Sequence, residues 1–438
     1  MIFCSEKRES ERKPYMEQEK KEKLTKMEID WILYDVGNSA FVLLATTILP
    51  IYFNYLAGLA GISEVDYLAY WGYAASVATL LVAFIGPVCG AIADTKGYKK
   101  PIFTICMLVG VVGCAALAIP KSWIVFLVVF VIAKVGYSAS LVFYDSMLPD
   151  ITTPERMDAV SSHGFAWGYI GSCVPFVFSL VFVLFYEKIG ITMVTAMVIA
   201  LIINALWWFL VTVPLLRHYR QVHYTNRTET ERGVVTERLR RLGQTLLDLK
   251  NHKKIFVFMI AYFFYIDGVY TIIEMATAYG SSLGLDSQGL LLALLLTQIV
   301  AFPFALLFGK AAKKYRTEKL IRLCILAYLC IALYAIQLDK QYEFWVLAVC
   351  VGMFQGAIQA LSRSYFARII PPEKSGEFFG IFDICGKGAS FMGTALMGLF
   401  AQITGKSNGG VAILAVMFLI GFFVFGKAVK LNEDKGDY

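Results

Sequence analysis

Apolar segments long enough to cross a lipid bilayer recur along the whole chain, separated by polar connections. A helix needs about 20 apolar residues to span a hydrocarbon core of ~30 Å. By this measure, we expect membrane spans at residues 32–57, 67–93, 101–119, 122–145, 162–186, 191–214, 255–280, 287–309, 319–337, 343–366, 377–403 and 410–430. Only 17% of the residues are charged, against about 25% in a soluble domain. The sequence therefore predicts an all-α membrane protein of about twelve transmembrane helices.

Lys and Arg residues are concentrated in alternate connections between the expected spans. Residues 94–100 hold three of them, 310–322 hold six, and 215–254 hold ten against four acids. Basic loops stay on the cytoplasmic side of a membrane, so we expect both termini and the central segment in the cytoplasm. A basic segment can also contact nucleic acid. The preference of basic loops for the cytoplasmic side and their attraction to anionic lipid explain the basic segment 215–254. We therefore expect membrane lipid, and no nucleic acid, as its partner.

The central basic segment divides the chain into two halves of six spans each. We expect a polar tail at 1–30, a first half at 31–214, a linker at 215–254, a second half at 255–430 and a tail at 431–438. The tail at 1–30 lacks the short apolar core of a signal peptide. Residues 152–172 align with 370–390, which places Pro154 on Pro372 and Gly168 on Gly386. Each stretch joins the fourth and fifth spans of its half, and this indicates two parallel six-helix repeats.

The connection between the second and third spans carries a spaced pattern of glycine, acidic and basic residues: Gly90, Asp94, Gly97 and Lys99-Lys100. It resembles the signature loop G-x-x-x-D-x-x-G-R-[KR] of the major facilitator superfamily, with Tyr98 at a usually basic position. The family implies two six-helix repeats around a central substrate site, the major facilitator fold.

Four further stretches narrow the resemblance, which runs from about residue 30 to 430: YDVGNSAF (34–41), FYDSMLPD (143–150), FFYIDGVYTI (263–272) and the region 355–387. They are similar to vacuolar effluxer-like facilitators. That family is linked in fungi to autophagy and to release of amino acids from the vacuole, and it is widespread in bacteria. Asp145 stands where the family commonly has Asn.

Ionisable residues lie inside several expected spans, where each costs about 2.5–3.5 kcal/mol on insertion scales and is a functional candidate by default. In chain order they include Asp35, Lys134, Asp267, Glu274, Arg363, Asp383 and Lys387. Gln355 and Gln359 precede Arg363 at intervals of four residues, so the tenth span presents one polar stripe. Asp383 and Lys387 have the spacing of an ion pair within one helix.

The resemblance implies that spans 1, 4, 7 and 10 line the central cavity. Asp267 and Glu274 are our candidates for proton coupling, because burial favours the protonated form of a carboxyl group. Lys134 and Lys387 are candidates for neutralising an anionic group of the substrate. The remaining candidates for substrate binding or coupling are Asp35, Asn38, Gln355 and Gln359.

Four other residues are candidates for gating: Gly90, Asp94, Gly97 and Arg363. Asp94 is placed to accept hydrogen bonds from the N-terminus of a helix in the other half, where the helix dipole favours an anion. Arg363 lies near the cytoplasmic end of its span.

The sequence offers no pattern for catalysis or for a bound cofactor. The nine cysteines show no paired metal-ligand spacing. The four histidines fall at span ends or in loops, where we expect them to be solvated. A Walker phosphate loop is missing from the sequence. We therefore predict no metal, no cofactor and no enzymatic activity.

These observations predict a secondary active transporter that moves a small solute by alternating access. A site with both signs of charge suits an amino acid or a similar zwitterion, with protons as the coupling ion. A lysolipid or other amphiphile is the alternative substrate, because 15% of the residues are aromatic. A non-transporting membrane receptor or scaffold is the alternative class. We expect a monomer in a bacterial cell (inner) membrane, or in a vacuolar membrane if the source is eukaryotic.

Overall fold

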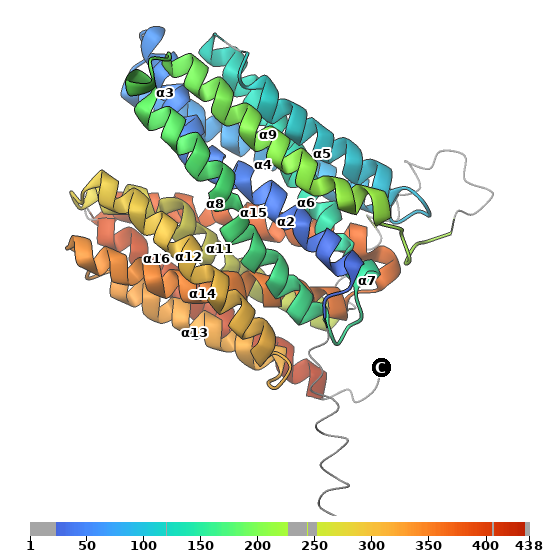
Figure 1. Cartoon of the computed structure of the whole chain (residues 1–438). Helices are drawn as coiled ribbons and strands as arrows, with labels where there is room; N and C mark the ends of the chain where they lie inside the picture. The colour runs from blue at the N-terminus through green and yellow to red at the C-terminus, as the bar shows by residue number, and fades with distance from the viewer. Residues whose placement is uncertain (1–22, 120, 227–242, 244–251, 405–406, 434–438) are drawn as a thin grey trace, which may run out of the picture.

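The computed structural model of the chain describes residues 23–119, 121–226, 243, 252–404 and 407–433 (Figure 1). Its elements, in chain order, are α2 (Lys26–Leu43), the π-helical segment η1 (Leu44–Ile48), α3 (Leu49–Leu59), α4 (Glu64–Ala93), α5 (Lys99–Ala116), α6 (Trp123–Ser146), α7 (Leu148–Ile151), α8 (Met157–Ile189), α9 (Met193–His218), α11 (Lys253–Ser282), α12 (Ser287–Ala311), α13 (Thr317–Ala335), α14 (Gln341–Ile369), the 3-10 turn η2 (Pro372–Lys374), α15 (Ser375–Thr404) and α16 (Ser407–Glu433).

Within this described part, ten helices are long and apolar enough to cross a membrane, with α2, η1 and α3 counted as one. The helices α13 and α15 occupy the two remaining predicted spans. Each predicted span is therefore found as a helix whose ends differ from the prediction by a few residues. The predicted all-α membrane architecture is confirmed.

The first helix begins inside the segment that the sequence suggested as a polar tail. Thr25 caps α2, because its hydroxyl oxygen accepts the Glu28 N–H at 3.2 Å. In return, the Glu28 carboxylate accepts the Thr25 N–H at 2.8 Å. Glu28 is buried, and Arg156 neutralises it with an Nη2–Oε2 distance of 2.7 Å. This capping box and ion pair allow a charged first turn to pack against the bundle.

Each half packs mainly on itself. In the first half, α2 lies against α8 and α9, and α5 lies against α6 and α9. In the second half, α11 lies against α15 and α16, and α12 lies against α14. Figure 1 shows the two groups as a blue-to-green and a yellow-to-red set of helices. The main contacts between the groups pair α4 with α15, and α8 with α12 and α14.

The two halves meet at the end of the bundle where α7 lies and diverge toward the end where α3 lies (Figure 1). We call the α7 end the basic face. It carries the connections 94–98, 152–156, 312–316 and 370–374, two of which were among the basic connections in the sequence. Hydrogen bonds and ion pairs between the halves gather at this face.

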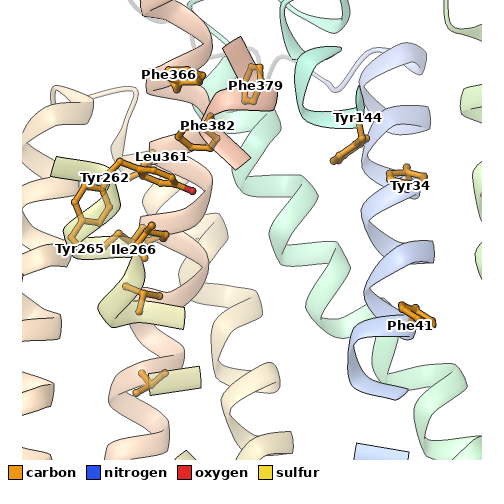
Figure 2. Close-up of a cluster of buried hydrophobic side chains, with 14 of the residues drawn as sticks. Tyr34, Phe41, Tyr144, Tyr262, Tyr265, Ile266, Leu361, Phe366, Phe379 and Phe382 are labelled. Carbon is orange, nitrogen blue, oxygen red and sulfur yellow. The ribbon is translucent and has the colours of Figure 1, made fainter. Parts of the chain in front are cut away.

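Each half has its own aromatic core beside the junction, and Figure 2 shows both. In the first half, the rings of Trp31 and Tyr144 stack at 4.3 Å between centroids. In the second half, Tyr262 and Phe382 stack at 4.0 Å. Stacked ring pairs of this kind contribute about 0.5–1.5 kcal/mol beyond the burial of their surface.

Candidate functional site

Arg363 of the second half is enclosed by residues of the first half. Its Nη1 donates to Asp145 Oδ1 at 2.9 Å, and its Nη2 lies 3.3 Å from Asp35 Oδ2. Its Nε donates to the hydroxyl oxygen of Ser161 at 2.9 Å. The Tyr144 hydroxyl donates to Asp35 at 2.7 Å. We call these five residues the Arg363 cluster.

Aromatic rings close around the guanidinium of this cluster. The Arg363 Cζ lies 4.7 Å from the ring centroid of Trp31 and 4.4 Å from that of Phe165. The side chain of Arg363 is 4% exposed, whereas that of Asp145 is 25% exposed. Asp145 is therefore the acid of the cluster that water or a solute reaches.

A glycine on α8 makes this approach possible. A methyl group on Gly164 would meet Asp35 Oδ2 at 2.5 Å and Arg363 Nη2 at 3.0 Å. A larger residue at this position would displace the ion pair. Small residues allow such close approach between membrane helices.

The polar stripe predicted on α14 faces the first half. Gln355 is buried and lies beside the side chain of Tyr169 on α8. Gln359 is half-buried. Asn38 behaves differently, because its Nδ2 donates to the Tyr34 carbonyl oxygen within α2 at 2.8 Å. This bond gives Asn38 a partner in its own helix, and nothing in the structure directs it to a solute.

Two further predicted residues bring opposite charges together from opposite halves. Lys134 on α6 and Glu274 on α11 lie close enough for their charges to interact. The Glu274 side chain is exposed, while Lys134 is half-buried and lies 5.8 Å from the ring centroid of Phe130.

Asp267 is buried between α11 and α15. Its Oδ1 accepts the Gly393 N–H at 3.0 Å and the Thr271 hydroxyl at 3.3 Å. Its Oδ2 has no hydrogen-bond partner among the residues that the structure describes. The side chain of Lys387, one of our substrate candidates, lies outside the described part of α15.

Asp94 joins the two halves at the basic face. It follows the last residue of α4 and accepts two N–H groups at the start of α15, from Gly376 at 2.7 Å and from Glu377 at 2.9 Å. We call this contact the first latch. Burial raises the pKa of Asp94 to about 7, although Lys99 and the two amides act in the opposite direction.

The glycines of the signature loop shape this latch. Gly90 packs directly on the backbone of Gly376, so there is no room for a side chain on it. Gly97 has a φ of +82°, which a glycine adopts without strain in the turn that leads into α5.

A second latch lies at the same face, and the sequence interpretation missed it. Asp158, in the first turn of α8, accepts Arg368 Nη1 at 2.8 Å and Nη2 at 2.9 Å. It also accepts the Thr317 hydroxyl at 2.6 Å. The internal alignment of 152–172 with 370–390 could have indicated this second latch, because it places Asp158 on Gly376, a residue of the first latch. In the first latch, the start of α15 donates hydrogen bonds from its backbone N–H groups. In the second latch, the start of α8 accepts hydrogen bonds through the Asp158 carboxylate.

Two of the four histidines that we expected to be solvated are partly exposed and also have a carboxylate partner. His218 Nδ1 lies 2.7 Å from Asp30 Oδ2, and His223 Nδ1 lies 2.9 Å from Asp150 Oδ1. Among the described residues, no group of three or more His, Cys, Asp or Glu side chains is arranged to hold a metal ion.

Two helical halves that meet in charged contacts at one face, with charges of both signs between them, define a membrane transporter of the major facilitator type. Solved structures agree with this fold. The transporter FucP in its outward conformation has a TM-score of 0.68 and 12% identity, over 92% of this chain and 98% of that chain. The human organic anion transporter MFSD10 has a TM-score of 0.63 and 15% identity, over 92% and 98%. At these identities, the likeness shows the fold alone.

Sequence comparisons show to which family of major facilitator transporters the chain belongs. The family model "Vacuole effluxer Atg22 like" matches residues 25–437. An uncharacterized MFS-type transporter, YxiO of Bacillus subtilis, is 40% identical over 407 residues, 92% of this chain and 94% of that protein. Autophagy-related protein 22-1 of Aspergillus niger is 25% identical over 282 residues, 60% of this chain and 45% of that protein. The chain belongs to the Atg22-like family of vacuole effluxers, and the predicted family is confirmed.

Proposed function

We propose that the protein is a secondary active transporter that moves a small zwitterion, such as an amino acid, by proton-coupled alternating access. The observation that carries this proposal is that the opposite charges of Lys134 and Glu274 lie close enough to interact. The two charges come from opposite halves, and Glu274 is exposed while Lys134 is half-buried. A zwitterion can place its carboxylate on Lys134 and its ammonium on Glu274, so that each charge exchanges one partner for another.

The Arg363 cluster supports the conformational part of the proposal. When the halves separate at the basic face, Arg363 must leave Asp35 and Asp145, with which it forms contacts in the closed arrangement. Removing one partner of a buried ion pair costs about 3–5 kcal/mol. A solute or a proton that reaches Asp145 would lower this cost, and so link loading of the site to opening of the basic face.

The surroundings of Asp267 support proton coupling. A buried carboxylate with one oxygen left without a partner is costly, whereas a protonated carboxyl group in the same place is not. Glu274 lies seven residues further along α11, on nearly the same side of the helix. Because Glu274 is exposed and Asp267 is buried, we propose that Glu274 passes protons between water and Asp267.

Uptake by proteoliposomes tests the function. The protein would be offered pooled radiolabelled amino acids, with and without a pH gradient, and assayed in parallel for solute counterflow. We expect accumulation that requires the gradient. In Asp267→Asn, the gradient should no longer drive accumulation, while counterflow remains. In Glu274→Gln, both activities should fall by about tenfold or more, the effect of ~1.4 kcal/mol.

Glu187→Gln is the matched control, because Glu187 is an exposed carboxylate at the end of α8. It should transport like the wild type. If no amino acid moves in folded wild-type protein, the zwitterion proposal fails. Movement of a fluorescent lysolipid in the same vesicles would then assign an amphiphile as the substrate.

A further inference from the structure

Asp158 of the first half lies within a set of hydrogen-bond donors that all belong to the second half. Its carboxylate accepts Arg368 Nη1 at 2.8 Å, Arg368 Nη2 at 2.9 Å and the Thr317 hydroxyl at 2.6 Å. The Ser364 hydroxyl donates to the same carboxylate. An arginine fork flanked by two hydroxyl groups binds an anionic group well, and Asp158 is the anion that these donors bind in the closed arrangement.

A cavity of about 450 Å³ adjoins these donors at the basic face. Its volume is within the range of small-molecule sites, ~300–1,000 Å³. Among the described residues, the cations that line it all come from the second half: Lys254, Lys313, Arg316 and Arg368. The second half adds one acid, Glu318, whose Oε2 lies 3.6 Å from Arg316 Nε. Four cations and one acid give the second-half side of the cavity a net charge of +3.

Two of these cations have no anionic partner in the part of the chain that the structure describes. Lys254 is half-buried at the start of α11, and Lys313 is exposed in the loop between α12 and α13. Neither ammonium group forms an ion pair with a described carboxylate. Lys254 and Arg368 also lie close enough for their like charges to interact. A negatively charged group between them would offset this repulsion.

We infer that this surface of the second half, which we call the anion site, binds a phosphate-bearing anion when the halves separate at the basic face. The anion takes the place of Asp158 on Arg368, and Lys254 and Lys313 face it from the same cavity. A phosphate group suits the site better than a carboxylate, because it carries about −1.5 to −2 charges and three acceptor oxygens.

The anion site and the second latch compete for the same donors. Arg368 cannot donate its fork to Asp158 and to a second anion at once. Closure also brings the carboxylates of Glu155 and Asp158 to the cavity, and these repel an anion. The anion therefore binds the open form more tightly, and a ligand shifts an equilibrium toward the form that it binds better. This inference rests on the proposed alternating access, but on neither its substrate nor its coupling ion.

The distance between two spin labels across the basic face tests the inference. Labels would be attached to cysteines introduced at Thr153 and Glu373, two exposed positions in opposite halves. The full chain would be studied without substrate in phosphatidylcholine nanodiscs, in inorganic phosphate or in potassium chloride of the same pH and ionic strength. At a phosphate concentration about ten times its dissociation constant, the ratio of closed to open molecules should fall about tenfold relative to chloride.

A second arm distinguishes a soluble anion from a lipid headgroup. Nanodiscs in which phosphatidic acid replaces part of the phosphatidylcholine present a phosphomonoester at the membrane surface, with no phosphate in solution. A shift toward the open form with inorganic phosphate alone would identify a soluble anion as the ligand. A shift with phosphatidic acid would identify a headgroup.

Two substitutions remove charge from the anion site without changing the donors of the second latch. Lys254→Gln and Lys313→Gln should each reduce the response to phosphate several-fold, and Lys313→Gln should leave the ratio in chloride unchanged. Lys314→Gln is the matched control, because Lys314 is the exposed neighbour of Lys313 and does not line the cavity. It should retain the wild-type response.

Equal ratios in phosphate and in chloride, together with no effect of phosphatidic acid, would overturn the inference. So would a full response in a variant that lacks both lysines. If Lys254→Gln does not yield folded protein, the exposed Lys313 decides, because an undiminished response in Lys313→Gln contradicts the inference. The distance measurement uses no solute. Its failure is therefore distinguishable from a failure of the uptake experiment.

Discussion

Gly90 of α4 and Gly376 of α15 pack backbone against backbone, so a methyl group on Gly90 would overlap the carbonyl oxygen of Gly376. We expect Gly90→Ala to hold the halves apart at the basic face, because overpacking costs about 1–3 kcal/mol and here falls on a rigid backbone. Uptake should fall about tenfold or more. Gly72→Ala is the control in the same helix, since a methyl group there meets no atom within 4 Å. A Gly90→Ala protein with wild-type uptake would show that the close contact is dispensable.

The first latch offers a second prediction. Asp94→Ala leaves the N–H groups of Gly376 and Glu377 without their acceptor, at a cost of about 1–3 kcal/mol for each buried group. The distance between spin labels on cysteines introduced at the exposed positions Thr153 and Glu373, in opposite halves, should shift toward the open form, while equilibrium binding of the substrate persists. Asp94→Asn keeps one acceptor, so its shift should be smaller. An Asp94→Ala protein that stays closed but loses binding would contradict a gating role.

Asp94 also has a pH dependence with a defined sign. Because burial raises its pKa to about 7, the closed face binds a proton that a solvated carboxyl group, with a pKa of about 3.9, has released. The contribution of Asp94 to closure is therefore complete below about pH 4 and is lost as pH rises through about 7. Asp94→Asn should remove this part of the response.

Arg363 provides a third prediction, on stability. Arg363→Gln leaves Asp35 and Asp145 without their cation and should destabilise the protein by about 3–5 kcal/mol. Adding Asp145→Asn should recover part of this loss, because it removes one unpaired charge. Thermal unfolding in detergent measures both effects. Arg322→Gln is the control: Arg322 is exposed on α13 and lies 4.7 Å from the ring centroid of Phe422. Equal losses in Arg363→Gln and Arg322→Gln would contradict the structural role of the cluster.

Gly393 provides a fourth prediction, on coupling. A methyl group there would overlap Asp267 Oδ1 and the Thr271 hydroxyl oxygen, so Gly393→Ala should displace the buried carboxyl group. We expect gradient-driven uptake to fall about tenfold or more, the effect of ~1.4 kcal/mol, while counterflow is retained. Gly398→Ala in the same helix has open space around it and should behave like the wild type. Loss of counterflow together with uptake would indicate a general packing defect instead.

The sequence was informative wherever the bilayer restricts what a chain can do. Every predicted span is a helix, because a fixed hydrocarbon thickness demands about 20 apolar residues. The charges inside spans were visible for the same reason. Asp35 and Arg363 stood out in apolar surroundings, and the structure brings them together although they lie far apart in the chain.

The sequence was less informative at the basic face, where charges are common. Asp158 was missed because an acid in the first turn of a helix is ordinary. Its bonds to Arg368, Ser364 and Thr317 mark it as a contact between the halves. His223 was predicted to be solvated because a histidine in a basic loop is also ordinary. Its partner Asp150 lies in a different element, and nothing in the basic run of residues 215–254 indicates that residues 219–225 fold back onto the loop between α4 and α5.

The sequence by itself determined the membrane class, the number of spans, the family and most of the residues that carry charge into the bilayer. These features depend on hydropathy and on local spacing, which each segment displays alone. Only the tertiary structure decided which charges are partners, which glycines touch and where the linker docks. Those contacts join residues from different helices and different halves, and their energies depend on burial and distance, which arise only when the two halves pack together.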